Sequence, residues 1–391
     1  MPKDGWKIRS EDRRSLDWLS SSGTMKEVLS PTQTDRYSRH LVLPGVGEDG
    51  QISLLKSSVL VVGAGGLGSP ALMYLAAAGV GKIGIIDDDV VSVSNLQRQI
   101  IHSSSSVGRP KVSSAAKWIE GLNDEIEVVA IEKKLTTGNS LEVIEEYDVV
   151  LDGTDNFETR YLIGDSCEIL GKPWVFGSIH RFEGQVSTFN LDDGPNYRDL
   201  FPDPPPPELA PNCSEAGVLG VLPGLVGTIQ ATEAIKVILG AGDCLRGRLL
   251  TIDSLSMEMR ALSFSKNPER KRVSSLKEEF GVDSSEIGAL EFVERKQNGW
   301  EPFLLDVRRS DEEAIATIEG TDLRIMHMEI PDNLEEIPVD RDIVIYCRTG
   351  VRSAAVAKFL SESGWSSDRI YNLSGGIHAW SDSVDSTIIK Y

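Results

Sequence analysis

The glycine-rich segment Gly63-Ala-Gly-Gly-Leu-Gly68 constrains the fold of this chain more than any other feature. It follows an apolar, β-rich run and opens a helical pattern, and Asp87 ends the next apolar run about 20 residues later. Glycines allow a backbone to approach a phosphate, amide groups at the start of a helix bind it, and the acid can bind ribose hydroxyls. The segment predicts a nucleotide site, for which an NAD- or FAD-dependent oxidoreductase is the first interpretation.

The rest of the chain alternates between short apolar runs and helical stretches. This rhythm is typical of a parallel sheet whose strands are joined by crossover helices. We therefore expect a Rossmann-like, mostly parallel α/β domain followed by a smaller α/β domain. The apolar runs that carry this prediction are 58–62, 82–87, 126–131, 148–151 and 174–177 in the first domain and 303–306, 343–346 and 369–373 in the second.

A length of 391 residues favours two domains over one. Residues 1–30 are polar and Ser-rich and are expected to form a mobile extension. The nucleotide-binding domain is expected at 31–265, and a charged stretch after it indicates a linker at 266–283. The smaller domain then takes residues 284–391.

Charge and composition exclude several classes of protein. The chain has 60 acidic and 40 basic residues and a net charge of −20, which repels nucleic acid. No uninterrupted apolar run reaches the roughly 18 residues of a membrane span, and the first residues lack the apolar region of a secretion signal, so we expect a cytoplasmic protein with no membrane partner. The 4 cysteines have no paired spacing, which argues against a disulfide framework and an all-cysteine zinc site.

Residues after Asp87 favour a triphosphate over a dinucleotide. Asn95, Arg98 and Lys111 supply cations and an amide, and a dinucleotide has fewer charges to neutralise. Asp155 follows the apolar run 148–151 and is expected at the carboxyl edge of the sheet, where a carboxylate can hold Mg²⁺ against phosphates. Each residue alone could be a solvated surface charge, but their order along the chain favours a site for ATP and Mg²⁺.

With these residues, the first domain resembles the MoeB/ThiF branch of the ubiquitin-activating enzyme superfamily, from about residue 36 to about residue 260. The likeness assigns nucleotide binding to Gly63, Gly65, Gly66, Gly68, Asp87, Asn95, Arg98, Lys111 and Asp155, with Asp87 on the ribose and Asp155 on the magnesium. It also implies that Arg39 reaches the γ-phosphate of ATP bound to the partner subunit, and hence a homodimer. The segments that carry it are 36–39, 63–68, 94–99, Lys111, 154–156, 183–185 and 213–220.

The reaction that this resemblance implies is adenylylation of a small ubiquitin-like sulfur-carrier protein that ends in Gly-Gly. The carrier's C-terminal glycine carboxylate attacks the α-phosphate in line, pyrophosphate leaves and an acyl-adenylate forms. Catalysis of this kind rests chiefly on positioning and charge neutralisation, with Arg39, Arg98 and Asp155 as the expected catalytic residues of the first domain.

Cys347 stands in a setting that activates a thiol. The segment Cys347-Arg-Thr-Gly-Val-Arg352 follows an apolar run and precedes a helical stretch. Converging backbone N–H groups, two guanidinium groups and a helix N-terminus lower a thiol's pKa from about 8.5 and stabilise a thiolate or persulfide. We therefore predict a reactive thiol rather than a core cysteine at the end of a strand.

With this loop, the second domain resembles the rhodanese family from about residue 284 to residue 380. The likeness rests on 305–308, on the loop Cys347, Arg348, Thr349, Gly350, Val351 and Arg352, and on 372–380. It implies that Cys347 takes sulfur as a persulfide from thiosulfate or a cysteine desulfurase and passes it to the acyl-adenylate to give a thiocarboxylate. The loop is also similar to that of cysteine-dependent phosphatases, so phosphate-ester hydrolysis is a second interpretation, although those loops usually lack a following Gly-Gly-x-x-x-Trp.

Cys213 is a second candidate nucleophile, because it matches the transfer cysteine of the ThiF-like family. A lone cysteine is more often a small buried hydrophobe, so both interpretations stay open. The sequence leaves open whether Cys213 is essential and whether it forms a thioester or an acyl disulfide with the other domain. If Cys213 forms a thioester, the chain would instead activate a ubiquitin-like protein for conjugation, with a regulatory rhodanese domain. The sequence also leaves open whether the rhodanese domain serves its own subunit or its partner.

The sequence departs from the MoeB pattern at one point. Many MoeB-like enzymes bind structural zinc with two Cys-x-x-Cys pairs, which would fall near 196–199 and 267–271, and neither segment contains cysteine. We therefore expect no zinc and expect packing or a dimer interface to hold this region. The 5 histidines show no ligand spacing. The absence of these cysteines, together with the rhodanese-like domain, resembles the MoeZ-like subset of the family. This resemblance implies a role in molybdopterin, thiamine or cysteine-type sulfur pathways.

Overall fold

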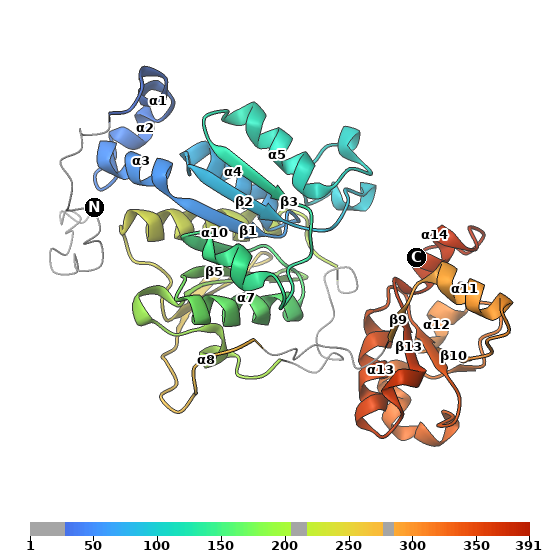
Figure 1. The fold of residues 1–391 in the computed structure, drawn as a ribbon. Helices are drawn as coiled ribbons and strands as arrows, with labels where there is room; N and C mark the ends of the chain where they lie inside the picture. Colours follow the sequence, from blue (N-terminus) through green and yellow to red (C-terminus); the bar gives the residue numbers. More distant parts are fainter. Residues whose placement is uncertain (1–27, 205–216, 277–284) are drawn as a thin grey trace. The chain divides into compact units, whose positions relative to one another are not determined.

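The computed structural model describes residues 28–204, 217–276 and 285–391, which form two compact units. The first unit holds the described residues up to 276, and the second holds residues 285–391. Each unit has its own sheet and hydrophobic core (Figure 1). Most of the predicted N-terminal extension, Cys213 and the end of the predicted linker lie outside the described residues.

The first unit is built on an eight-stranded sheet with the order β3-β2-β1-β4-β5-β6-β7-β8. Strands β1 to β5 pair in parallel, whereas β6, β7 and β8 pair antiparallel. The predicted mostly parallel α/β fold is therefore confirmed. The strands are β1 Ser58–Val62, β2 Lys82–Ile86, β3 Glu127–Ile131, β4 Val149–Asp152, β5 Trp174–His180, β6 Glu183–Phe189, β7 Arg248–Asp253 and β8 Glu258–Ser263.

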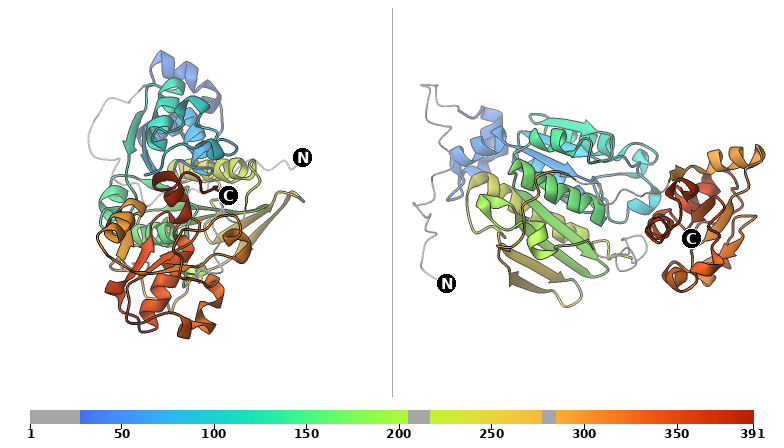
Figure 2. Two further views of the ribbon diagram at one scale, coloured as in Figure 1. Left: turned by 90° about the vertical axis from the view of Figure 1, so that its right-hand side faces the viewer. Right: turned by 60° about the horizontal axis from the view of Figure 1, so that its bottom comes forward.

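Helices cover both faces of this sheet (Figures 1 and 2). The strand order runs in one direction from β1 to β3 and reverses at β4, so right-handed crossovers place α4 and α5 on one face and α6 and α7 on the other. The reversal brings the carboxyl ends of β1 and β4 side by side. The helices are α1 Pro31–Arg36, α2 Ser38–Leu41, α3 Gly47–Lys56, α4 Gly68–Ala78, α5 Lys111–Leu122, α6 Ser140–Glu145, α7 Phe157–Leu170, α8 Tyr197–Leu200 and α10 Leu222–Leu239.

The apolar sequence of α10 reflects its place in the core. By length and composition alone this helix could cross a membrane. It packs, however, against α4, β5 and β6, and Leu222, Val226 and Ala234 belong to the hydrophobic core of the first unit. We therefore interpret α10 as a core helix.

Ion pairs hold the region in which the MoeB-like cysteine pairs would fall. Arg270 Nε donates to Asp199 Oδ1 at 2.7 Å, and Arg270 Nη2 donates to Glu168 Oε1 at 2.8 Å. The Asn196 amide donates to Asp199 Oδ2 at 2.7 Å, and Asn196 Nδ2 donates to Glu168 Oε2 at 3.0 Å. This buried cluster joins α7, α8 and the segment after β8, and it lies within one chain.

The second unit has a five-stranded parallel sheet with the order β11-β10-β12-β13-β9. Successive strand residues point to opposite faces, so Leu304 and Val344 join one core cluster and Leu305 and Ile345 join the other. Helix α13 packs against β12 and β13, and α11 packs against α14. The elements are β9 Ser285–Ile287, α11 Ala289–Gln297, β10 Phe303–Asp306, α12 Ser310–Glu313, β11 Leu323–Arg324, β12 Ile343–Tyr346, α13 Val351–Glu362, β13 Ile370–Leu373 and α14 Gly376–Ser383.

Candidate active sites in the two units

The glycine loop packs directly on the neighbouring loop after β4. Gly63 follows β1 directly and has a φ of 95°, and a Cβ added to it would lie 2.8 Å from the Gly153 carbonyl oxygen. A Cβ on Gly68 would overlap the Gly63 carbonyl oxygen. Around Gly65 the nearest atom to such a Cβ is Gln99 Nε2, at 3.7 Å, so this part of the loop has open space. Glycine is therefore required for packing at Gly63 and Gly68 and leaves room at Gly65.

Asp87 fixes the glycine loop and lies beside a cation. Its Oδ2 accepts the Ala64 amide at 2.8 Å, and its Oδ1 accepts the Asp89 amide at 2.9 Å. Lys111 Nζ lies 2.6 Å from Asp89 Oδ2 and 4.0 Å from Asp87 Oδ1. Burial raises the pKa of Asp87, although Lys111 and the two amides oppose the rise. The structure thus brings together Asp87, Lys111 and the glycine loop.

Asn95 and Arg98 lie in a turn that follows Asp87. The Ser92 amide donates to Asn95 Oδ1 at 3.1 Å, and Arg98 Nη1 donates to the Ser94 carbonyl at 3.1 Å. The Gly220 backbone packs on this turn, because a Cβ added there would come within 2.6 Å of the Gln97 carbonyl oxygen. The segment before α10 therefore supports the turn that carries both residues.

Asp155 follows β4 and is exposed next to the glycine loop. The loop around it is held from both sides, because Thr154 Oγ1 donates to Asp152 Oδ1 at 2.6 Å and the Thr159 amide donates to Asn156 Oδ1 at 2.8 Å. Among the described residues, none bonds to the Asp155 carboxylate. One exposed carboxylate at this edge fits Mg²⁺, which takes few protein ligands and completes its shell with phosphates and water.

His102 contributes to the site although its sequence spacing gave no signal. Its Nε2 lies 2.9 Å from the Ala64 carbonyl oxygen in the glycine loop, and its Nδ1 lies 2.9 Å from Ser114 Oγ in α5. Burial lowers the pKa of His102, so the ring is held neutral. The histidine thereby joins the glycine loop to the helix that begins with Lys111.

Arg39 is exposed on α2. In the described part of the chain, no hydrogen bond or ion pair joins it to the nucleotide site. Its predicted role across a subunit interface therefore stays a prediction. Cys213 falls outside the described residues, so its predicted role is equally a prediction.

Cys347 lies at the end of β12 in the second unit. Its Sγ accepts the Gly350 amide at 3.1 Å and the Ser353 hydroxyl at 3.4 Å, and the side chain is 0 % exposed. Gly350 has a φ of 91°, which turns its amide toward the sulfur. The surroundings therefore donate hydrogen bonds to the sulfur, as an anion requires, but the burial means that sulfur exchange needs the loop to move.

Helix α14 holds the cysteine loop through its first turn. The Ile377 amide donates to the Cys347 carbonyl at 2.9 Å, and the His378 amide donates to the Arg348 carbonyl at 3.1 Å. A Cβ on Gly376 would overlap the Cys347 carbonyl oxygen. The Gly-Gly pair is thus explained by the close approach of helix and loop.

Two buried arginine–carboxylate pairs flank this loop. Arg308 Nη2 pairs with Asp306 Oδ2 at 2.6 Å, and both side chains are 0 % exposed. Arg352 Nη1 and Nη2 donate to Glu312, each at 2.7 Å. The first pair accounts for the Asp-Val-Arg motif as a structural feature of the strand end.

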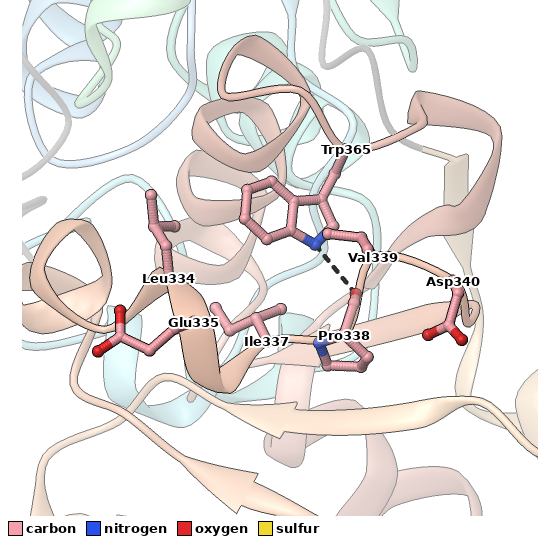
Figure 3. A pocket seen from close by; sticks show the side chains of 7 residues that line it. All are labelled: Leu334, Glu335, Ile337, Pro338, Val339, Asp340 and Trp365. Atoms are coloured by element: carbon pink, nitrogen blue, oxygen red, sulfur yellow. Dashed lines mark hydrogen bonds between the residues drawn. The ribbon is translucent and has the colours of Figure 1, made fainter.

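A shallow depression on the second unit lies apart from the cysteine loop. It is lined by Leu334, Glu335, Ile337, Pro338, Val339, Asp340 and Trp365, and Trp365 Nε1 donates to the Pro338 carbonyl at 3.0 Å (Figure 3). It contains no member of the cysteine loop, so we assign it no part in the chemistry.

A glycine-loop nucleotide site on one sheet and a cysteine loop on another define a two-domain enzyme that transfers adenylyl groups and sulfur. The ThiF family matches residues 37–273, and the rhodanese-like domain matches residues 289–383. The chain belongs to the ThiF family, in the branch that carries a rhodanese-like domain, and is an ATP-using adenylyltransferase and sulfurtransferase. The oxidoreductase interpretation is therefore wrong.

One relative supports this assignment along nearly the whole chain, and two others support it over 60 to 68 % of the chain. "Probable adenylyltransferase/sulfurtransferase MoeZ" of Mycobacterium tuberculosis is 44 % identical over 381 residues, which cover 93 % of this chain and 97 % of that protein. "SAMP-activating enzyme E1" of Haloferax volcanii is 50 % identical over 68 % of this chain and 96 % of its own length. "Sulfur carrier protein adenylyltransferase" of Thermus thermophilus is 50 % identical over 60 % of this chain and 89 % of its own length.

The fold of the first unit is also found in solved structures. Escherichia coli MccB with ATP has a TM-score of 0.53 and 20 % sequence identity, with 62 % of this chain and 75 % of that chain covered. At this identity the likeness shows the fold alone.

Proposed function

We propose that the enzyme adenylylates the C-terminal glycine of a small ubiquitin-like sulfur-carrier protein and then replaces the adenylate by sulfur from a Cys347 persulfide. The observation that carries this proposal is that one chain holds both a glycine loop with Asp87 and Lys111 beside it and a cysteine whose sulfur receives two hydrogen bonds. The Thermus relative, named for a sulfur carrier protein, supports the class of substrate.

In the adenylylation step, the first unit binds and orients ATP. Asp87 is positioned for the ribose, and Asn95, Arg98 and Lys111 for the phosphates. Because Lys111 rests against Asp89 and Asp87 at 2.6 and 4.0 Å, we expect its ammonium group to turn toward the phosphates when the nucleotide enters. Asp155 would hold Mg²⁺, which neutralises phosphate charge when bound.

In the sulfur step, the outer sulfur of the Cys347 persulfide attacks the acyl carbon and AMP leaves, which forms an acyl disulfide. A second thiol, Cys213 or one from solution, then attacks the Cys347 sulfur. The thiocarboxylate leaves with the electron pair, and the attacking thiol is left in a disulfide with Cys347. Before sulfur is loaded, the Gly350 amide and the Ser353 hydroxyl stabilise negative charge on the Cys347 thiolate.

The Haloferax relative supports a second candidate, because its name describes an activating enzyme of the E1 type. In that case the carrier would be held as a thioester at Cys213 for conjugation, and the second unit would be regulatory. The two candidates differ in the mass of the released carrier.

We further propose a homodimer in the cytoplasm. The exposed position of Arg39 supports a role across a subunit interface. Cys167, Cys244 and Cys347 are all free thiols, as expected in a reducing compartment.

Incubation with ATP, Mg²⁺, a Gly-Gly carrier and a sulfur donor tests the proposal. We expect the carrier to return with one oxygen replaced by sulfur. Cys347→Ala should prevent the replacement of oxygen by sulfur on the carrier. It should leave the rate of ATP–pyrophosphate exchange within about twofold of the wild type, because the adenylate forms in the first unit. A carrier linked to Cys213 and no thiocarboxylate would favour the second candidate.

A further inference from the structure

Arg352, the last residue of the cysteine loop, is bound by the carboxylate of Glu312. Its Nη1 and Nη2 donate to Glu312 Oε2 and Oε1, each at 2.7 Å, and the two side chains are 14 % and 8 % exposed. Such a bidentate pair uses the planar fork through which an arginine would otherwise bind two oxygens of an oxyanion. The most obvious cation of the loop is therefore already neutralised.

The fold holds Glu312 at the edge where the loop lies. Strand β10 pairs in parallel with β12, with Asp306 opposite Tyr346, so the segments that follow the two strands share one edge of the sheet. The Arg309 amide donates to Glu312 Oε2 at 3.2 Å. Burial alone would raise the pKa of Glu312, but hydrogen bonds and charge from Arg352 and Arg309 hold this pKa at about 2. The carboxylate is ionised at neutral pH.

We propose that Glu312 is a specificity-determining residue for the sulfur donor. By occupying Arg352 it disfavours donors that present an oxyanion, such as thiosulfate, and leaves the loop to donors that present a sulfur without oxygens, such as a persulfide on another protein. The proposal rests on the proposed function of Cys347. The same withheld fork disfavours a phosphate ester, which argues against phosphatase chemistry at this loop.

Both kinds of donor load Cys347 by the same exchange. The Cys347 thiolate attacks the outer sulfur, the donor's S–S bond breaks, and its electron pair leaves on a thiolate or on sulfite. The two donors differ in that thiosulfate also brings a sulfonate group whose charge needs a cation. Carboxylates outnumber Lys and Arg in residues 285–391, which increases the repulsion of a dianion.

Substitution of Glu312 tests the proposal, with Glu313 as the matched control. Glu312→Gln removes the charge and keeps the shape, whereas Glu313 pairs with Arg324 at 3.0 Å and is 42 % exposed. With cyanide as acceptor, we expect Glu312→Gln to raise kcat/KM for thiosulfate about tenfold or more and to change it for glutathione persulfide less than about threefold. Glu313→Gln should leave both values unchanged. A folded Glu312→Gln enzyme with unchanged thiosulfate kinetics would overturn the proposal.

Two further measurements keep the test independent of one variant. In Glu312→Gln/Arg352→Gln the gain with thiosulfate should disappear, and a gain that persists would show that Arg352 does not bind the oxyanion. In the wild type, mass spectrometry should show a sulfur added to Cys347 at least about tenfold faster from the persulfide than from thiosulfate. Equal rates would overturn the proposal, whereas no added sulfur from either donor would overturn the proposed function itself.

Discussion

Arg160 Nε lies 3.2 Å from Asp152 Oδ2, and the two side chains are 5 % and 0 % exposed. Arg160 also donates to the Thr154 carbonyl at 3.4 Å, and its guanidinium group lies over two aromatic rings. The pair ties the end of β4 to the first turn of α7. The loop that carries Asp155 is therefore fixed by a buried ion pair between the residue before the loop and a residue after it.

Removal of one member of this pair should unfold the first unit more readily. Arg160→Met leaves the Asp152 carboxylate buried without its cation, and we expect the free energy of unfolding to fall by about 3 to 5 kcal/mol in urea titrations. Arg260→Met is the control, because Arg260 pairs with Glu258 on the surface and should cost less than about 1 kcal/mol. A loss at Arg160 no larger than at Arg260 would contradict the structural role.

Asp155→Asn should lower the rate of adenylylation without lowering the stability of the fold. The side chain is exposed, so we expect no change in the melting temperature, but ATP–pyrophosphate exchange should fall by about 100-fold or more because the proposed magnesium ligand is lost. Glu158→Gln, on the same exposed edge but outside the proposed site, should retain full exchange. Exchange that survives Asp155→Asn would remove the magnesium role from this residue.

The ion-pair cluster around Arg270 should make stability depend on pH. Burial alone would raise the pKa of Asp199, but hydrogen bonds from Arg270 and from backbone amides hold it below its usual value. A carboxylate with a depressed folded-state pKa stabilises the fold above the unfolded-state pKa of about 3.9, and this contribution is lost as the pH falls through the folded-state value.

We therefore expect Asp199→Asn to lower the free energy of unfolding by about 3 kcal/mol at pH 7. The difference from the wild type should stay constant down to about pH 5 and shrink below about pH 4. Urea titrations across this range provide the measurement. A difference that grows on acidification would show that the charge of Asp199 does not stabilise the fold.

Gly376→Ala should stop sulfur transfer and spare adenylylation. The added Cβ would overlap the Cys347 carbonyl and would sit at a φ of 56°, so the contact between α14 and the cysteine loop must break. Gly299→Ala is a matched control, since Gly299 has a φ of 90° with nothing within 4 Å and carries only the backbone cost of about 1 to 2 kcal/mol. Equal sulfurtransferase activity in the two variants would contradict the role of this contact.

The parallel core of the first unit could be predicted because buried strands read as continuous apolar runs. Strands β1, β2 and β4 are almost entirely buried and match the runs closely. The final strand β8 is exposed along its whole length, so neither an apolar run nor a clean alternation marks it. This strand therefore escaped prediction.

The residues of the candidate sites also fall into two groups, those that the sequence predicted and those that only the structure reveals. Asp87 and Cys347 follow strong strand signals, and their neighbours were found from the order of residues along the chain. His102 and Glu312 act through partners that are close only after folding, Ser114 and Arg352, and no local spacing announces such contacts. Long-range pairs of this kind need the tertiary structure, because hydrophobic periodicity carries no information about them.

The contact between α14 and the cysteine loop has a consequence for how the loop can vary. Two carbonyls of the loop accept hydrogen bonds from amides of α14, and the Cys347 sulfur accepts one from the Gly350 amide. Part of the polarity around the sulfur therefore comes from peptide groups and not from the side chains of the loop. Substitutions of the Thr349 and Val351 side chains therefore leave these backbone hydrogen bonds in place. Val351, which is exposed, can vary in shape more freely than Thr349, whose hydroxyl is buried.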